Sequence, residues 1–140
     1  MLRATGLAWT ARQRYTVPNY APRFARRSGP PELELSFHTE EIRDACEIRA
    51  KALAMIGVSA GLELHRRLAD IEAVETADEL SALFPELVVN RSLNERGLIF
   101  AEGYTLVFRS GHVQTPLDAA GTPDWGNITR IRLMGIEVEP

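Results

Sequence analysis

The chain has 140 residues, 45% hydrophobic and 25% charged, which excludes a fibrous or wholly disordered protein and leaves room for one ordinary domain. A single cysteine, Cys46, excludes an internal disulfide, and no apolar run is long enough to span a membrane, so we expect a cytoplasmic protein. The net charge of −3 hides an asymmetry, because residues 1–31 hold six arginines and no acid, whereas residues 32–140 hold 10 basic and 19 acidic residues.

Residues 1–31 contain four prolines and no sustained apolar period, and Ser-Gly-Pro-Pro at 28–31 is typical of a linker. We expect a basic, Pro-rich and largely disordered extension. A solvated tail or upstream read-through explains it most simply. Its arginines would also suit a nucleic-acid arm or an organellar transit peptide.

The next stretch predicts one strand and two helices. Residues 33–37 alternate apolar and polar side chains, as in a half-buried strand. Thr39 predicts the N-cap of a helix that ends near Gly57. An apolar stripe that begins after Ser59 predicts a second helix reaching about Glu75. The two helices would form a helical hairpin.

A capping-box pair, Thr76 and Glu79, predicts a short third helix over residues 76–83. Runs rich in β-branched and aromatic residues then predict four strands. These runs are Leu87–Val89, Gly97–Ala101, Tyr104–Arg109 and Ile128–Val138. A tight hairpin at 102–103 and a long loop at 111–127 would join the later strands. The order indicates an α+β fold, a small antiparallel sheet packed against a helical hairpin.

Several segments, taken in order, carry a resemblance. Leu-Ser-Phe at 35–37 leads into residues 39–47, and residues 68–75 follow. Gly-Tyr-Thr-Leu-Val-Phe stands at 103–108, and Asp-Trp at 124–125 precedes Gly-Ile-Glu at 135–137. These pieces resemble HigB-like killer toxins of the RelE/ParE superfamily, whose matching strand reads Gly-Tyr-Arg-Leu-Ile-Phe. The resemblance covers most of residues 33–139 and implies a toxin domain at 32–140.

This resemblance implies the toxin of a type II toxin–antitoxin system, usually a ribosome-dependent mRNA endoribonuclease (mRNA interferase). A helix-turn-helix antitoxin would hold it inactive, often in a heterotetramer, and no metal or other cofactor would be needed. One branch of the superfamily instead poisons DNA gyrase. In the nucleases, basic groups and a tyrosine or histidine orient the ribose 2′-hydroxyl, and arginine stabilises charge on phosphate.

Two departures from the family pattern favour an alternative. Thr105 stands where the family's strand has arginine, and the chain ends Ile-Glu-Val-Glu-Pro where HigB-like toxins end Asp-Tyr-His. Both changes remove groups proposed for catalysis. The alternative is a catalytically silent RelE-fold protein that binds an antitoxin or gyrase. Residues 32–86, with 13 acidic and five basic residues, would suit a partner with basic segments.

Five arginines are the candidate phosphate ligands. Arg130 and Arg132 lie two apart on the last predicted strand and therefore project from one face. Arg109, on the neighbouring strand, would join them for catalysis, and Arg91 and Arg96 would add RNA-binding charge from the loop and strand edge. An ordinary solvated face with ion pairs to nearby acids would give the same pattern.

Tyr104 and His112 are the candidate proton-handling residues. Tyr104 shares the alternation of the apolar residues in its strand, so core packing is its competing role, and a loop histidine such as His112 is often only solvated. Glu137 and Glu139 would repel RNA, since neither has a basic partner nearby in the sequence. Structural roles are expected for three further residues: His38, Cys46 and His65. No spacing of histidine and cysteine predicts a metal site.

Overall fold

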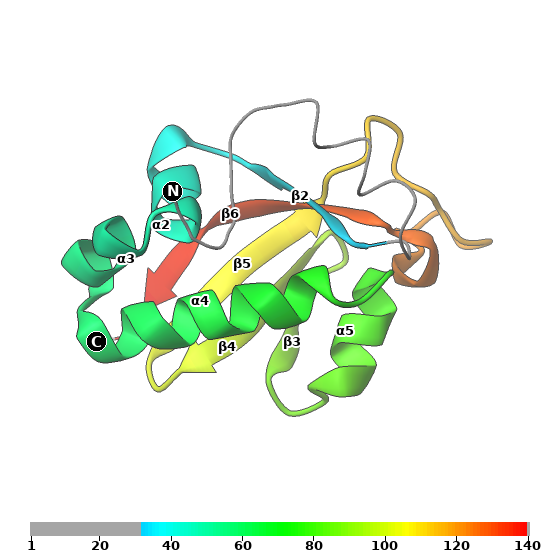
Figure 1. Ribbon diagram of the computed structural model, residues 1–140. Coiled ribbons are helices and arrows are strands. Elements are labelled where there is room, and N and C mark those ends of the chain that lie inside the picture. Colours follow the sequence, from blue (N-terminus) through cyan, green and yellow to red (C-terminus); the bar gives the residue numbers. More distant parts are fainter. Residues whose placement is uncertain (1–31, 140) are drawn as a thin grey trace. The chain divides into compact units, whose positions relative to one another are not determined.

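A computed structural model of the protein describes residues 32–139 (Figure 1). Its centre is a five-stranded sheet in the order β2-β6-β5-β4-β3. The strands are β2 Glu34–Phe37, β3 Val88–Ser92, β4 Glu95–Ala101, β5 Tyr104–Ser110 and β6 Arg130–Val138. The extension predicted at residues 1–31 lies outside the described residues, so its expected disorder stays a prediction.

The sheet is an antiparallel meander with one parallel edge. β3, β4, β5 and β6 pair in antiparallel fashion, as the sequence predicts. β2 instead pairs in parallel with β6, from Glu34 opposite Arg130 to Phe37 opposite Leu133. The helices and the meander separate these two strands in sequence, which gives the chain the long crossover that a parallel pair needs. The α+β prediction is confirmed, with a mixed sheet.

Four α-helices lie in the described part of the chain: α2 Glu40–Glu47, α3 Arg49–Ile56, α4 Val58–Glu72 and α5 Ala77–Leu83. Both predicted caps form, because Thr39 Oγ1 accepts from the Ile42 N–H at 3.2 Å, and Thr76 and Glu79 make a reciprocal capping box. None of the helices within residues 32–139 has the length and apolar character needed to cross a bilayer.

The prediction of one unbroken helix from Thr39 to Gly57 is wrong. Ile48 adopts an extended conformation, with φ −120° and ψ 108°, and separates α2 from α3. This break lets the chain turn from the sheet, where α2 buries Ile42, toward α4. Gly61 of α4 meets α3 closely, since a Cβ there would lie 2.7 Å from Leu53 Cδ2. The helical hairpin is therefore α3 and α4.

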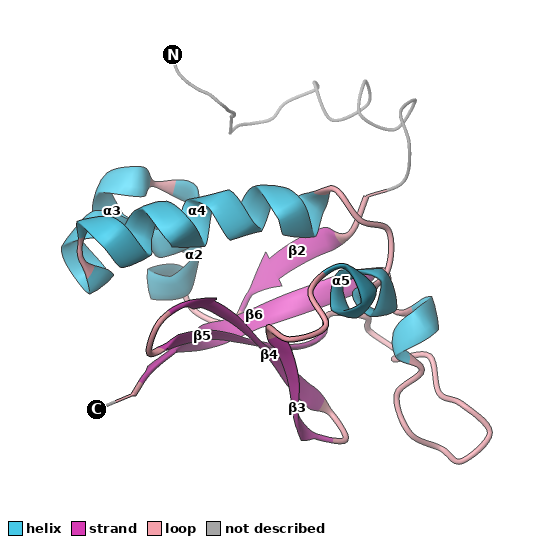
Figure 2. Ribbon diagram, turned by 90° about the horizontal axis from the view of Figure 1, so that it is seen from below, coloured by secondary structure: helices cyan, strands magenta, loops and turns pink. Residues whose placement is uncertain are grey.

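The core lies between the helices and one face of the sheet (Figure 2). On β5, Leu106 and Phe108 point to the helices and are fully buried, and Trp125 of the 3-10 helix η1, Trp125–Asn127, meets Phe108 edge-on at 6.1 Å. Thr105 and Arg109 alternate with them and point to the other side. None of the helices within residues 32–139 covers that second face of the sheet (Figure 2).

Candidate functional site

The side of the sheet that points away from the helices carries a row of polar residues. Strand register sets Glu95 of β4 opposite Arg109 of β5, and Arg109 opposite Arg132 of β6, with Ser36 of β2 beyond. We call this surface the open face. Direct partners on neighbouring strands project together, with Cβ atoms about 5 Å apart. Two arginines therefore stand side by side on a surface that none of the described helices covers.

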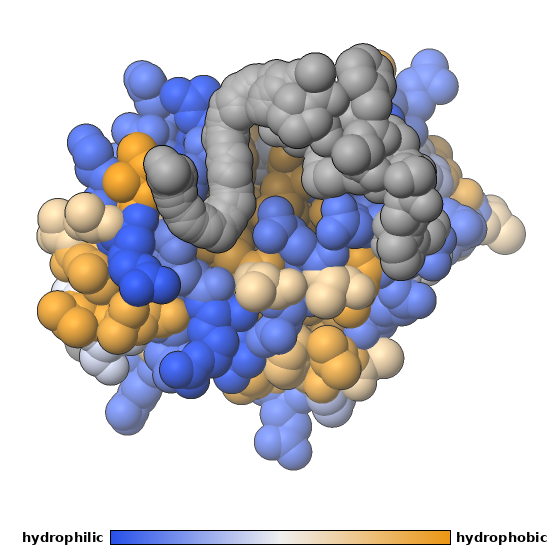
Figure 3. All heavy atoms as spheres, viewed as in Figure 1, coloured by the Kyte–Doolittle hydropathy of each residue, from blue (hydrophilic) through white to orange (hydrophobic). Residues whose placement is uncertain are grey.

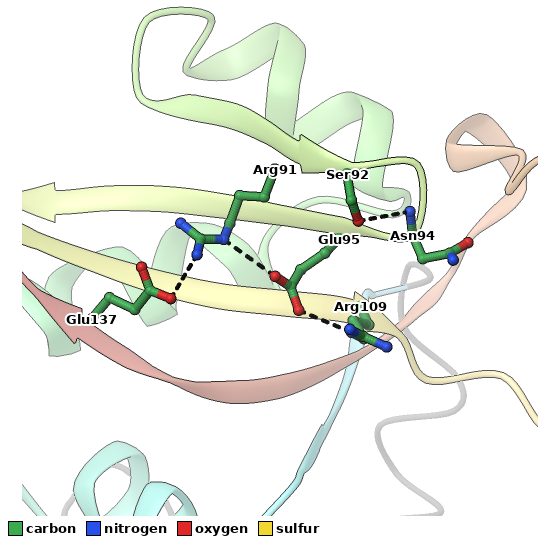
Figure 4. Close-up of polar contacts among 6 residues, drawn as sticks. All are labelled: Arg91, Ser92, Asn94, Glu95, Arg109 and Glu137. Carbon is green, nitrogen blue, oxygen red and sulfur yellow. Dashed lines mark hydrogen bonds and ion pairs between the residues drawn. The ribbon is translucent and has the colours of Figure 1, made fainter.

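Ion pairs extend from this row across the sheet (Figure 4). One carboxylate oxygen of Glu95 accepts from Arg109 Nε at 2.9 Å, and the other accepts from Arg91 Nε at 3.2 Å. Arg91 also donates from its Nη2 to Glu137 on β6 at 2.6 Å. The hydrogen bond from Arg109, helped by that from Arg91, lowers the pKa of Glu95 against the opposing effect of burial. Glu95 is therefore a shared counterion for two arginines.

The path of Arg91 depends on Gly97. A Cβ at Gly97 would lie 3.3 Å from Arg91 Cδ and 2.7 Å from Thr105 Cγ2. The absent side chain thus leaves room for the Arg91 stem to lie over β4 at Gly97. Glu137, which Arg91 reaches, is the register partner of Thr105. The Arg91 guanidinium therefore lies beside the row that contains Thr105 and Glu137, although Arg91 itself belongs to β3.

Arg130 and His112 lie at the end of the open face where β6 begins. Arg130 Nε is 3.2 Å from Glu34 Oε1 across the parallel pair. His112 Nε2 accepts from the Thr129 N–H at 3.0 Å, so the proton of the neutral ring sits on Nδ1. Partial burial lowers the pKa of His112, the Arg130 charge lowers it further, and Glu34 opposes them. Protonation at Nε2 would break the bond to Thr129, so the neutral ring offers only its Nδ1–H as a donor.

Tyr104 does not join these residues. It lies on the helical side of the sheet, where its ring centroid is 5.9 Å from that of Phe100. Its hydroxyl donates to the Ile56 carbonyl at 3.4 Å, at the end of α3. The packing role that alternation predicts is confirmed, and the sheet itself lies between Tyr104 and the open-face residues Arg109 and Arg132.

The expectation that five arginines share one surface is wrong for Arg96. Its guanidinium lies 4.4 Å above the Trp125 ring, on the helical side. Nη1 donates to Asp78 at 3.0 Å and to Ser81 at 2.9 Å, so the side chain ties β4 to α5. The sequence could have predicted this position, because residues two apart in a strand share a face. Arg96 therefore lies on the same side as Leu98 and Phe100, whose side chains face the core.

The expected ion pairs between the candidate arginines and nearby acids form at Glu95, which lies outside the strand predicted there. Sequence reasoning missed Gly97. It also missed the partner of Glu137, because Arg91 is 46 residues away in the sequence. Cys46 is buried, and burial raises the pKa of its thiol, as expected for a structural residue. Within residues 32–139, no three acidic, histidine or cysteine side chains gather in a cluster able to hold a metal ion.

No protein-family model matches the sequence, and neither a curated protein nor a solved structure matches it.

Proposed function

We propose that this chain is the toxin of a type II toxin–antitoxin system, with a RelE/ParE-like domain at residues 32–140 that acts as an mRNA endoribonuclease on the ribosome. The observation that carries the proposal is the direct pairing of Arg109 and Arg132 on the open face, with Arg130 two residues before Arg132 in β6. Adjacent guanidinium groups on an uncovered sheet are suited to bind a phosphodiester through paired donors. The sequence resemblance to HigB-like toxins adds to this support.

Cleavage on this face would need no metal. The ribose 2′-oxygen attacks phosphorus and the bond to the 5′-oxygen breaks, which leaves a 2′,3′-cyclic phosphate and a 5′-hydroxyl. The 2′-hydroxyl gives up one proton and the 5′-oxygen gains one. Arg109 and Arg132 would stabilise the charge that builds on the phosphate oxygens. The Nδ1–H of His112 would donate a hydrogen bond to a phosphate oxygen, because Thr129 engages the ring lone pair on Nε2. Water would take the 2′-hydroxyl proton and return one to the 5′-oxygen. Tyr104 has no part in this proposal.

A second candidate is a binding protein of the same fold without nuclease activity. The ion pairs favour it, because Arg91, Arg109 and Arg130 each already contact a carboxylate. The helical side also offers a surface to a helix-turn-helix antitoxin or another protein. Apolar side chains gather there around the α3–α4 turn, where Met55, Val58 and Leu62 are exposed (Figure 3). An acidic surplus in residues 32–86 would attract a basic partner.

Induced expression of the full chain in a bacterial host tests both candidates. Growth and mRNA 5′ ends are compared for the wild type, the Arg109→Ala, Arg132→Ala double variant, and an Arg43→Ala, Arg66→Ala control. The control removes two exposed arginines from α2 and α4, so it changes the net charge equally. Translation-dependent cuts that the control keeps and the open-face variant loses would support the nuclease. Arrest with intact mRNA would favour the binding protein, and full growth would overturn the toxin proposal.

A further inference from the structure

The ion pair between Arg91 and Glu137 spans the open face from the edge strand β3 to β6. At 2.6 Å it is the shortest contact of the Arg91 guanidinium, and the Glu95 carboxylate joins it to Arg109 (Figure 4). Four charged side chains, two positive and two negative, thus form one ion-pair network. In this arrangement the network has no net charge with which to attract a polyanion.

The Glu137 carboxylate stands where an anionic ligand would stand. Glu137 accepts from Nη2 of Arg91, whereas Glu95, the shared counterion, accepts from Nε. The Arg91 stem lies over Gly97, where a Cβ would approach Arg91 Cδ to 3.3 Å, so the backbone at Gly97 helps to set the guanidinium position. A phosphate oxygen and a carboxylate oxygen make the same charge-assisted hydrogen bonds to arginine.

The pair is also exchangeable. The Glu137 side chain is 56% exposed and that of Arg91 is 31% exposed, so water and ligands reach both groups. Exposed ion pairs contribute little to stability because their attraction is screened and their side chains lose freedom. An incoming phosphate can therefore replace Glu137 at small cost to the fold.

We propose that Arg91 forms a second phosphate subsite beside the Arg109–Arg132 site, and that Glu137 occupies this subsite as an internal competitor until a nucleic acid phosphate displaces it. This inference rests on the proposed function, since it assigns the subsite to the next phosphate of a strand bound at Arg109 and Arg132. The ligand is a single-stranded RNA that brings at least two phosphates to the open face.

The test measures binding of the purified full-length protein to a short, fluorescently labelled single-stranded RNA, 2′-O-methylated so that it cannot be cleaved. Residues 1–31 are the same in every variant, so their contribution cancels in the ratios. Glu137→Gln should tighten binding about fivefold and steepen the plot of log affinity against log salt by about 0.7, the value for one more phosphate contact. Glu139→Gln, the matched control, removes one charge from the same end of the chain and should change affinity less than about twofold.

Arg91→Ala, alone and combined with Glu137→Gln, completes a double-mutant cycle. Alone it should weaken binding, because the RNA loses the contact that displaces Glu137 and meets two carboxylates that Arg91 no longer neutralises. In the Glu137→Gln background it should abolish the gain. Thermal melts and a second variant, Glu137→Ala, guard against a folding defect. Equal effects of Glu137→Gln and Glu139→Gln, or a gain that survives Arg91→Ala, would overturn the inference.

The two proposals fail separately. If Arg109→Ala, Arg132→Ala abolishes RNA binding while Glu137→Gln behaves like its control, the proposed function stands and the Arg91 subsite falls. If the double variant binds RNA as the wild type does, the Arg109–Arg132 phosphate site is wrong, and a gain through Arg91 would still support the subsite as an independent RNA contact.

Discussion

The two faces of the sheet use the same residue type for opposite purposes. On the helical face Arg96 is 14% exposed, stacks on Trp125 and ties β4 to α5. On the open face Arg109 is 51% exposed and pairs with a carboxylate that it shares with Arg91. Burial decides the difference, because a desolvated guanidinium must keep its partners whereas an exposed one can exchange them. Stability should therefore lie on one face and ligand binding on the other.

The sharpest test of this contrast uses neighbouring residues of β5. Phe108 is fully buried and packs against Trp125, so Phe108→Ala should lower the free energy of unfolding by about 3–5 kcal/mol through lost burial and the cavity left behind. Arg109→Ala, one residue along on the other face, should change it by no more than about 0.5 kcal/mol. Urea denaturation of both variants measures the difference. Equal losses would break the contrast between the faces.

The next largest difference in the free energy of unfolding is expected between an arginine on the helical face and an arginine on the open face. Arg96→Ala should cost about 1–3 kcal/mol, because it removes the stack on Trp125 and the bonds to Asp78 and Ser81. Arg132→Ala, an exposed arginine on the open face, should cost no more than about 0.5 kcal/mol. Thermal and urea unfolding check both. A stable Arg96→Ala variant would show that the helical-face contacts are dispensable.

Much of the fold could be predicted from local patterns. The alternation on β5, the caps at Thr39 and Thr76 and the hairpin at Gly103 each depend on residues within a few positions of one another. The break at Ile48 could not be predicted, because the apolar spacing continues through it. Packing of α3 on α4, a tertiary effect, overrides that spacing.

Less of the site could be predicted, because its contacts cross the sheet. Alternation alone places Arg130 and Arg132 on one face and Tyr104 on the other. It does not give the register that sets Arg109 opposite Arg132, nor the 46-residue link from Arg91 to Glu137. Arg96 differs for another reason: β4 begins two residues earlier than predicted, so Arg96 lies within the strand and shares the core-facing side of Leu98.

Two glycines of the open face sharpen the comparison on a smaller scale. Gly97→Ala should cost about 1–2 kcal/mol, because the new Cβ would meet Thr105 Cγ2 at 2.7 Å and press on the Arg91 stem at 3.3 Å. Gly135→Ala, in the same row of the sheet, meets nothing within 4 Å and should be neutral or slightly stabilising. Chemical denaturation separates them. Similar free energies of unfolding for the two variants would mean that the Arg91 stem does not need the space left at Gly97.

The smallest effect concerns one histidine on each side of the domain. Burial lowers the pKa of His65 below its ordinary value of 6.5, although the bond from His65 to the Ala45 carbonyl opposes it, and burial with the Arg130 charge lowers the pKa of His112. As the pH falls through 6.5, the unfolded chain binds these protons first, so the free energy of unfolding should decline below that pH and be unaffected by them above about 7.5.

His65→Gln and His112→Gln keep a hydrogen-bonding atom near Nε2 without titrating. Urea midpoints at pH 8 and 5.5 should therefore differ less in each variant than in the wild type, and the reduction should be larger for His65, the more deeply packed ring. An unchanged difference for His112→Gln would mean that its bond to Thr129 does not oppose protonation, and Nε2 would then be available to take a proton at the open face.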